Sequence, residues 1–322
     1  MQKKGIWKKI RSFLLYSLPL LLFLLTIGFV YQEIGESRAQ KKYTAVGETY
    51  DIYGKKMHIY TGGKGSSTVV FHAGSGTPNP YVDFSTLYDR IGHETKYAVI
   101  DRFGYGYSDL SNRKRDIDNI VDENRKLLQE SGQKPPYILV GHSLSSLEVI
   151  RYAQRYPEEV SGIVLLDGGN PEYYSKQKPL TFFSHVLQFL RTTGLFRFVY
   201  EINEGFFISG RNNLKFVPNE LKEIDQAFTL LKMGNKNVTD ELRQAQKNAT
   251  KVLKANNGLA MPIIVLTADS FGEIKQDWLE SQKELTKWSS AGKQIVVKDS
   301  QHYIHHYRPG FIAEEILNLV KE

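Results

Sequence analysis

Short apolar runs alternate with amphipathic stretches along most of this chain. The apolar runs predict strands at Met57–Tyr60, Thr68–His72, Tyr97–Asp101, Tyr137–Val140, Ile163–Asp167, Ile263–Thr267 and Gln294–Val297. Apolar positions at helical spacing predict helices between most of them, at Tyr81–Ile91, Ile117–Glu130, Leu147–Tyr156, Lys275–Trp288 and Phe311–Lys321. This alternation is typical of βαβ units, so the sequence predicts an α/β fold with a mostly parallel, doubly wound sheet.

Residues 168–261 break this rhythm, because they form a stretch of 94 residues without a convincing strand pattern. The first part is aromatic, with Phe182, Phe183, Phe189, Phe196, Phe198, Tyr200, Phe206 and Phe207, and the second part, Pro218–Ala255, has a polar helical pattern. The stretch is too long for a plain loop, so we expect a helical cap inserted into a core formed by residues 50–167 and 262–322. The aromatic residues would form the core of the cap, a pocket for an apolar substrate, or a surface that touches a membrane.

The amino-terminal region predicts a membrane anchor. Phe13–Tyr31 contains no charged residue, and a helix of this length matches the roughly 30 Å hydrocarbon core of a bilayer. The basic residues in front of it favour a cytoplasmic segment at 1–12, a transmembrane helix at 13–31, a polar stalk at 32–49 and a main domain outside the cytoplasm. A cleaved signal peptide is the alternative, although its apolar region usually runs over only about 7–15 residues.

Charge and cysteine content exclude several other classes of function. Residues 1–43 hold eight Lys or Arg and two Glu, which leaves a net charge of +1 for the rest of the chain out of +7 in total. The main domain is therefore close to neutral, and we expect no nucleic-acid partner. The chain has no cysteine, which excludes disulfides, Cys-ligated zinc and thiol catalysis.

The segment Val-Gly-His-Ser-Leu-Ser-Ser at residues 140–146 lies between a predicted strand and a predicted helix. A sharp strand-to-helix turn with serine at its apex is the geometry of a nucleophile elbow, which exposes the hydroxyl at the carboxyl end of a sheet. Gly141 fits the first small position of the G-x-S-x-G pattern, whereas Ser145 stands where the pattern has its second glycine. Ser143 is therefore a candidate nucleophile, and an ordinary turn is the alternative.

A glycine-rich loop at residues 72–76, His-Ala-Gly-Ser-Gly, follows an early predicted strand. A backbone amide near Gly74 could pair there with the amide of Leu144 to hold an oxyanion, and each such donor contributes roughly 3–4 kcal/mol to the transition state. A phosphate-binding loop is disfavoured, because no Gly-Lys-Ser/Thr follows.

A histidine cluster follows the last predicted strand. His302 could reach the Ser143 hydroxyl from that edge of the sheet and act as general base, and His305 and His306 lie nearby. A metal site at His302 and His306 is disfavoured, because no third ligand is evident.

A general base of this kind needs a carboxylate that fixes its tautomer. Asp167 and Asp269 each stand at the end of a predicted strand, and either one keeps the chain order serine, aspartate, histidine. The residues themselves leave this choice open.

These segments together resemble the α/β-hydrolase fold family over roughly residues 50–320. The resemblance rests on residues 72–76, on Asp-Arg-Phe-Gly-Tyr-Gly-Tyr-Ser at 101–108, on the elbow around Ser143, and on His302 followed seven residues later by Pro309. It implies that Ser143 is the nucleophile, that His302 is the base, and that Asp101 and Arg102 hold the loops beside the elbow.

The chain departs from the family pattern at several positions. Ala73, Ser145 and Gln301 stand where the family usually has glycine. The family's usual acid position lies a little beyond Asp269, while members that place the acid after the preceding strand would use Asp167, which we favour slightly.

The sequence thus predicts a membrane-anchored serine hydrolase that cleaves an ester or related acyl bond through an acyl-enzyme on Ser143. His302 would be the base, Asp167 or Asp269 the acid, and Leu144 and Gly74 the oxyanion donors, with no cofactor or metal required. The anchor and the aromatic cap favour an apolar or lipid-like acyl substrate. Dehalogenases and epoxide hydrolases of this fold use an aspartate nucleophile, so Ser143 argues against those reactions. The alternative is a non-catalytic, membrane-tethered binding or signalling module with the same fold.

Overall fold

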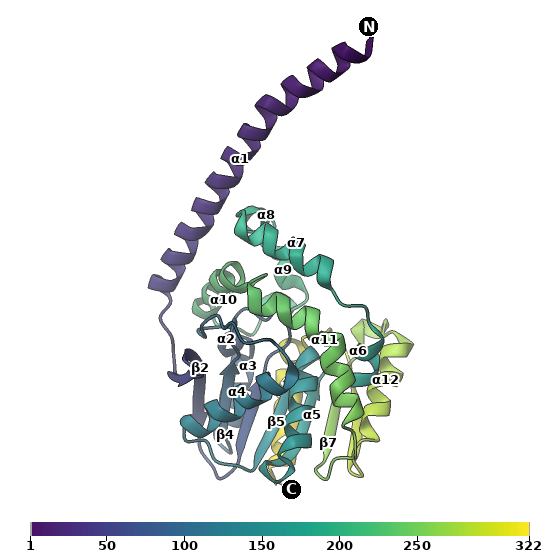
Figure 1. Cartoon of the computed structure of the whole chain (residues 1–322). Coiled ribbons are helices and arrows are strands. Elements are labelled where there is room, and N and C mark those ends of the chain that lie inside the picture. Colours follow the sequence, from purple (N-terminus) through teal and green to yellow (C-terminus); the bar gives the residue numbers. More distant parts are fainter. Residues whose placement is uncertain (1, 322) are drawn as a thin grey trace.

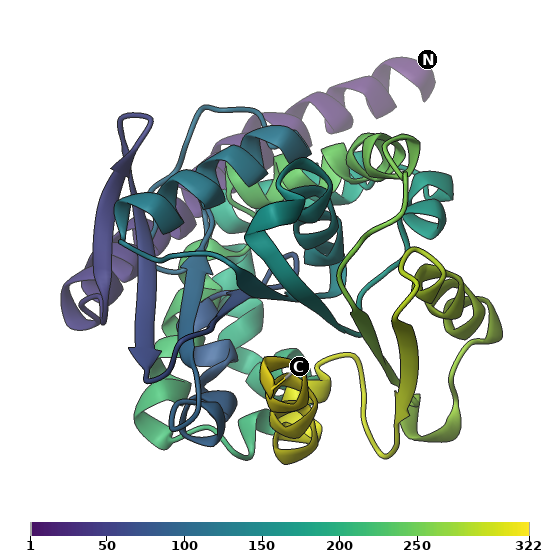
Figure 2. The same ribbon diagram turned by 90° about the horizontal axis from the view of Figure 1, so that it is seen from below.

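A twisted eight-stranded sheet forms the centre of the protein, with strand order β1-β2-β4-β3-β5-β6-β7-β8 (Figure 2). The structure, a computed structural model, describes the backbone of residues 2–321 and the side chains of residues 11, 13 and 15–321. The strands are β1 (Glu48–Ile52), β2 (Lys55–Gly63), β3 (Thr68–His72), β4 (Lys96–Asp101), β5 (Tyr137–His142), β6 (Val160–Leu166), β7 (Ile263–Ala268) and β8 (Gly292–Val297). The pairings of β1 with β2 and of β2 with β4 are antiparallel, and all others are parallel.

Helices cover both faces of this sheet, as a doubly wound fold requires (Figure 2). The core helices are α2 (Pro80–Asp83), α3 (Ser85–Ile91), α4 (Ile117–Glu130), α5 (Ser146–Arg155), α12 (Gln276–Thr286), α13 (Ile304–Tyr307) and α14 (Pro309–Lys321). Apolar side chains of α4, α5 and α12 pack with one face of the sheet, and those of α3 and α14 pack with the other. The predicted α/β fold class is confirmed.

Strand β1 is the one strand that the sequence pattern did not predict. Its five residues, Glu-Thr-Tyr-Asp-Ile, are mostly exposed because the strand lies at the edge of the sheet, and only Ile52 is fully buried. Because an edge strand buries few side chains, it can lack the apolar run by which the other strands were predicted.

The region expected to form the cap contains only helices, and it lies over the carboxyl ends of the parallel strands (Figure 1). These helices are α6 (Pro171–Lys176), α7 (Thr181–Thr192), α8 (Leu195–Ile202), α9 (Glu204–Ser209), α10 (Asn219–Lys232) and α11 (Lys236–Lys254). The aromatic residues divide into two groups. Phe196 and Tyr200 are buried against Leu230, whereas Phe182 and Phe206 are among those that remain exposed.

A single long helix, α1 (Gln2–Lys42), contains the segment expected to be an anchor and continues through most of the expected stalk. Among the described residues it is the one helix long and apolar enough to cross a membrane by length and composition. The side chains of Lys3, Lys4, Lys8 and Lys9, on which the orientation was predicted, lie outside the described residues.

Candidate active site

Ser143 stands at the sharp turn between β5 and α5. Its backbone φ is +55°, a left-handed conformation that costs a residue with a side chain about 1–2 kcal/mol. Gly141 is closely packed, since an added Cβ would lie 3.0 Å from Cγ2 of Val149 and 3.2 Å from the Ser145 carbonyl oxygen, and these neighbours would have to shift to admit it. Ser145 has a local reason too: its Oγ lies 2.7 Å from the His72 carbonyl and 2.8 Å from the His142 carbonyl. This hydroxyl links the turn to the last residue of β3, a hydrogen bond that a glycine at position 145 could not make.

His302 lies in the loop between β8 and α13 and connects two other candidate residues. Its Nε2 is 2.8 Å from Ser143 Oγ, and its Nδ1 is 2.7 Å from Oδ2 of Asp167. When the Nδ1 hydrogen is donated to Asp167, Nε2 is free to accept the hydrogen of the Ser143 hydroxyl. The three side chains therefore form a continuous hydrogen-bonded chain at the carboxyl edge of the sheet.

Asp167 directly follows β6 and is nearly buried, with φ of +44°. Its second oxygen, Oδ1, accepts hydrogen bonds from the Ala268 amide at 3.1 Å and from Trp278 Nε1 and Gln282 Nε2 at 3.0 Å each. Burial alone would raise the pKa of this carboxyl, but the hydrogen bond and charge of His302 and the two α12 donors outweigh it and lower the pKa. Asp167 is thus held as a carboxylate.

Trp278 and Gln282 are members of the site that the sequence reasoning missed. They stand four residues apart on α12, and this spacing on the helix after the penultimate strand is the signal that could have found them.

Asp269 makes a different set of contacts. Its carboxylate accepts hydrogen bonds from the backbone amides of Phe271, Asp299 and Ser300, at 3.1, 2.9 and 3.0 Å. Burial opposes ionisation here, but these backbone donors lower its pKa. Asp269 therefore shapes the loop that leads to His302, while the carboxylate in contact with the His302 ring is that of Asp167.

The glycine-rich loop after β3 lies against the elbow. A Cβ added to Gly74 would lie 2.7 Å from Nδ1 of His142 and 3.1 Å from Cβ of Ser143. This close approach places the Gly74 backbone beside Ser143. Leu144 is the next residue in the chain after Ser143. Both residues expected to donate to an oxyanion thus flank the Ser143 side chain.

The remaining departures from the family pattern have structural partners. The Ala73 carbonyl accepts a hydrogen bond from Arg102 Nη1 at 2.7 Å, and Arg102 also pairs with Glu148 and Glu241. These contacts join the loop after β3 to α5 and to the cap. Gln301 Oε1 accepts a hydrogen bond from the Tyr307 hydroxyl at 3.1 Å.

His305 and His306 form a buried network with Asp83. Their Nε2 atoms lie 3.1 and 3.0 Å from the Asp83 carboxylate, and Arg211 of the cap pairs with the same carboxylate at 2.9 Å. A His-His-Asp group could in principle hold a metal ion, but the Arg211 guanidinium already supplies the positive charge that Asp83 requires. The network joins the cap to the core.

His306 of this network and the neighbouring buried His142 predict a stability that falls in mild acid. Burial lowers the pKa of His306 from 6.5 to about 3, and burial with the neighbouring His302 and His305 lowers that of His142 well below 6.5. As the pH falls below 6.5, the unfolded chain binds protons at these two positions and the folded protein does not, so the folded state loses stability.

We expect the free energy of unfolding to fall by about 1 kcal/mol per histidine between about pH 7.5 and about pH 5.5. Urea titrations at both pH values measure this change, and His306→Gln should reduce it. The exposed His93 provides the matched control, His93→Gln. An equal pH dependence in wild type and His306→Gln would contradict the prediction.

Two cavities adjoin the hydrogen-bonded chain. The first, of about 320 Å³, extends from Ser143 and Leu144 along α6 and α11 to Leu180. The second, of about 470 Å³, lies beside His302 and Trp278. The hydrogen-bonded chain therefore has open space on both its Ser143 side and its His302 side.

Comparison with known proteins agrees with this architecture. A model of the alpha/beta hydrolase fold family matches residues 69–309. An uncharacterised protein of Bacillus subtilis (strain 168), YbdG, is 31% identical over 99% of both chains. Among solved structures, bromoperoxidase from Bacillus anthracis gives a TM-score of 0.66 at 18% identity, covering 86% of this chain and 100% of that chain. Epoxide hydrolase from Bacillus megaterium gives a TM-score of 0.66 at 13% identity, covering 85% and 100%.

These structural neighbours share the fold rather than the sequence, whereas the family match extends over more than half of the chain. From these matches we conclude that the protein belongs to the α/β-hydrolase fold family.

Proposed function

We propose that the protein is a membrane-anchored serine hydrolase that cleaves an ester or related acyl bond. The observation that carries the proposal is the hydrogen-bonded chain from Ser143 Oγ through His302 to Asp167, at 2.8 and 2.7 Å. A serine hydroxyl becomes a competent nucleophile when an oriented imidazole takes its proton, and this chain has that order of groups.

In the proposed mechanism, Ser143 Oγ attacks the acyl carbonyl while His302 Nε2 takes the hydroxyl proton. Asp167 holds the Nδ1 hydrogen and stabilises the imidazolium that forms. His302 then gives its proton to the leaving group, which departs and leaves an acyl-enzyme. Water, deprotonated by His302, releases the acid and restores Ser143.

The negative charge on the carbonyl oxygen would be held by the backbone amides of Leu144 and Gly74. This assignment is supported by the tight approach of Gly74 to Ser143 and His142. Donors fixed in position by the backbone stabilise the charge without reorganising, which is why such sites contribute strongly to catalysis.

Gly74→Ala tests the oxyanion role. The new methyl group would overlap His142 and Ser143, so the loop must move and one donor is displaced. We expect kcat on an activated ester to fall about 100-fold with a smaller change in KM. Gly310→Ala is the matched control, because a Cβ there meets no heavy atom within 4 Å. An unchanged kcat in Gly74→Ala would remove Gly74 from the oxyanion site.

The membrane part of the proposal rests on α1. Its uncharged stretch at 13–31 has the length of a bilayer core, and the basic residues before it favour a cytoplasmic amino terminus. The site at the carboxyl edge of the sheet would then lie outside the cytoplasm.

An apolar acyl group suits the cavity beside Ser143 better than a charged one. Leu144, Leu180 and Leu242 contribute to its walls, together with the rings of Tyr173 and Tyr174. Small-ester, lipid and related acyl substrates all fit this chemistry.

Labelling with a fluorophosphonate probe tests the function as a whole. We expect the folded wild-type protein to bind the probe covalently, with the adduct on the peptide that contains Ser143 in mass spectrometry. A folded protein that neither labels nor hydrolyses any activated ester would instead favour the non-catalytic binding module.

A further inference from the structure

Three cap helices expose an unusual number of apolar side chains. The side chains of Phe182, Ile202 and Phe206 are 83%, 70% and 71% exposed. We define the apolar cap surface as the exposed apolar residues of α7–α9, namely Phe182, Phe183, Phe189, Leu195, Phe198, Val199, Ile202 and Phe206. A concentrated apolar surface of this kind marks a binding face rather than ordinary exposed positions.

Helix α1 is fixed to the same cap helices. Its backbone passes so close to the α7–α8 turn that a Cβ added to Gly28 would lie 2.1 Å from the Thr193 carbonyl oxygen. One turn later Gln32 is buried, where its Nε2 donates to the Leu230 carbonyl at 2.9 Å and its Oε1 accepts from Arg197 Nε at 3.0 Å. These contacts hold α1 and the cap together as one unit.

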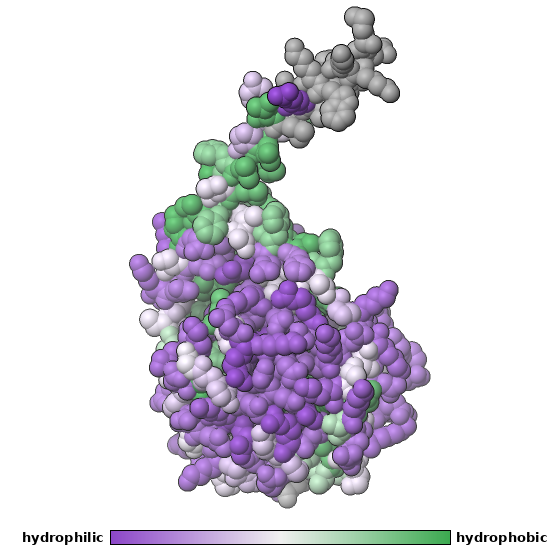
Figure 3. Space-filling model, in the orientation of Figure 1, coloured by the Kyte–Doolittle hydropathy of each residue, from purple (hydrophilic) through white to green (hydrophobic). Residues whose placement is uncertain are grey.

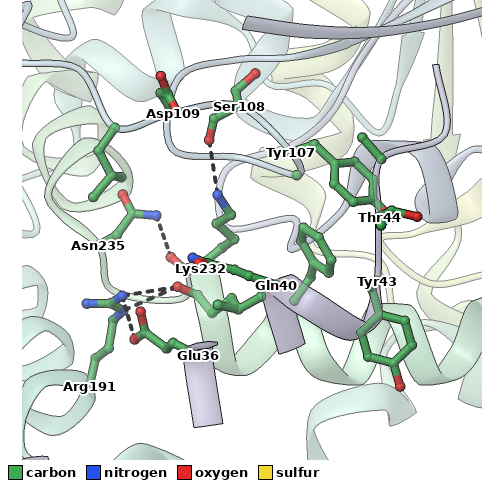
Figure 4. A pocket seen from close by; sticks show the side chains of 15 residues that line it. Glu36, Gln40, Tyr43, Thr44, Tyr107, Ser108, Asp109, Arg191, Lys232 and Asn235 are labelled. Carbon is green, nitrogen blue, oxygen red and sulfur yellow. Dashed lines mark hydrogen bonds and ion pairs between the residues drawn. The ribbon is translucent and has the colours of Figure 1, made fainter. Parts of the chain in front are cut away.

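Further along α1, a pocket of about 530 Å³ lies between the helix, the cap and the core (Figure 4). Glu36 pairs with Arg191 of α7 at 2.7 Å, and Lys232 of α10 donates to the Ser108 carbonyl at 3.0 Å. The contacts of α1 with the cap therefore extend from Gly28 to Glu36.

The position of this attachment sets the height of the cap relative to a bilayer. Gly28 lies three residues before Tyr31, the last residue of the expected transmembrane segment, and three residues span about 5 Å along a helix. If α1 spans a membrane, the α7–α8 turn lies at the depth where interfacial helices bury their apolar face, about 5–10 Å. Figure 3 shows the hydrophobic surface of α1 continuing onto the adjoining part of the cap.

We propose that the apolar cap surface is embedded in the bilayer that α1 spans, and that the substrate reaches Ser143 from that bilayer as an acyl lipid. This inference rests on the proposed membrane anchor and serine hydrolase activity. The bilayer is the partner because the surface is continuous with α1 and is held at the depth of its interface.

The cavity beside Ser143 is connected to this surface by one short segment. Leu180 lines the cavity and is 49% exposed, and after Thr181 come Phe182 and Phe183 of α7. Lys178, also on the cavity wall, is exposed and suits an anionic headgroup. An acyl chain could pass along Leu180 while its headgroup remains at the surface.

The absence of cysteine from the chain allows a direct test of depth. Single Phe182→Cys and Phe206→Cys variants of the full chain are labelled with a fluorophore and placed in phosphatidylcholine vesicles that contain either a shallow or a deep doxyl-labelled lipid. Leu20→Cys in α1 reports the anchor. The matched control is Lys134→Cys, which is exposed and lies just before β5, at the amino ends of the parallel strands and so away from the cap.

We expect the two cap labels to be quenched roughly twofold or more, as interfacial residues are, and the label at position 134 to be unaffected. A quenched label at position 20 with unquenched cap labels would overturn the cap inference and leave the anchor standing. Unquenched labels at position 20 and on the cap would remove both.

Substrate access is tested separately with a triple variant, Phe198→Gln, Ile202→Gln and Phe206→Gln. Its turnover of a fluorogenic acyl lipid embedded in vesicles should fall about tenfold, because less apolar surface enters the bilayer. Its kcat/KM on a soluble short-chain ester should match wild type. Equal losses on both substrates, or no loss on the lipid, would overturn the proposal, whereas inactivity of wild type on every ester would defeat the proposed function itself.

Discussion

Ser143→Ala is expected to lower kcat on an activated short-chain ester by about 10⁴-fold or more. The variant keeps the elbow and both candidate oxyanion donors but has no atom that can form the acyl-enzyme. The His302 ring would lose its 2.8 Å partner and keep its contact with Asp167. Steady-state hydrolysis of a p-nitrophenyl ester measures the loss, and thermal unfolding checks that the protein remains folded.

Ser145→Gly is the matched control for this experiment, because it changes a serine two residues away and introduces the family's usual residue. It removes the hydrogen bonds to the His72 and His142 carbonyls and leaves Ser143 in place. We expect its kcat to stay within about tenfold of wild type, since only the support of the loop is weakened. A Ser143→Ala protein with near wild-type kcat would rule out an acyl-enzyme on this residue.

Asp167→Asn is expected to lower kcat by about 10³–10⁴-fold. Oδ1 of Asp167 faces three N–H donors, from Ala268, Trp278 and Gln282, so the amide oxygen of an asparagine would take that side. Its NH₂ group would then point at His302 Nδ1. A donor in that position favours the tautomer with hydrogen on Nε2, which cannot accept the proton of the serine hydroxyl.

Asp269→Asn tests the other candidate acid, since the sequence left the choice between Asp167 and Asp269 open. It weakens the hydrogen bonds to the Asp299 and Ser300 amides, so we expect a lower thermal unfolding temperature and a loss in kcat of no more than about tenfold. If Asp269→Asn lost activity as Asp167→Asn is predicted to do, and Asp167→Asn remained active, the acid would be Asp269.

The reason that sequence alone left these two carboxylates open lies in the sheet. Strands β6 and β7 are parallel neighbours, so residues at their carboxyl ends come close together whatever their roles. Which one meets His302 depends on side-chain direction: Asp167 points to the imidazole, while Asp269 is occupied by amides of the loop after β8. No pattern of apolar and polar residues encodes that direction.

Other features could be predicted from the order of apolar and polar residues along the sequence. The buried strands and α4 stand out because apolar spacing is the direct consequence of burial, and the elbow was found because a strand, a serine and a helix are contiguous in sequence. Hydrogen-bond partners of the site that come from distant segments of the chain could not be predicted. Trp278 and Gln282, which donate to Asp167, are two examples. The packing of α1 on the cap could not be predicted either. In the sequence Gln32 has the character of an exposed polar residue, and only the structure shows its hydrogen bonds to Leu230 and Arg197.

The left-handed backbone of Ser143 and Asp167 depends on the completed fold. An unfolded or partly assembled chain has no reason to hold either residue at φ near +50°, since each pays about 1–2 kcal/mol for it. Only the completed sheet holds β5 and β6 side by side and enforces both turns at once. If Ser143 is the nucleophile proposed above, a covalent probe would label native molecules and not collapsed or half-formed ones, so the extent of labelling would measure the folded fraction in a mixed sample.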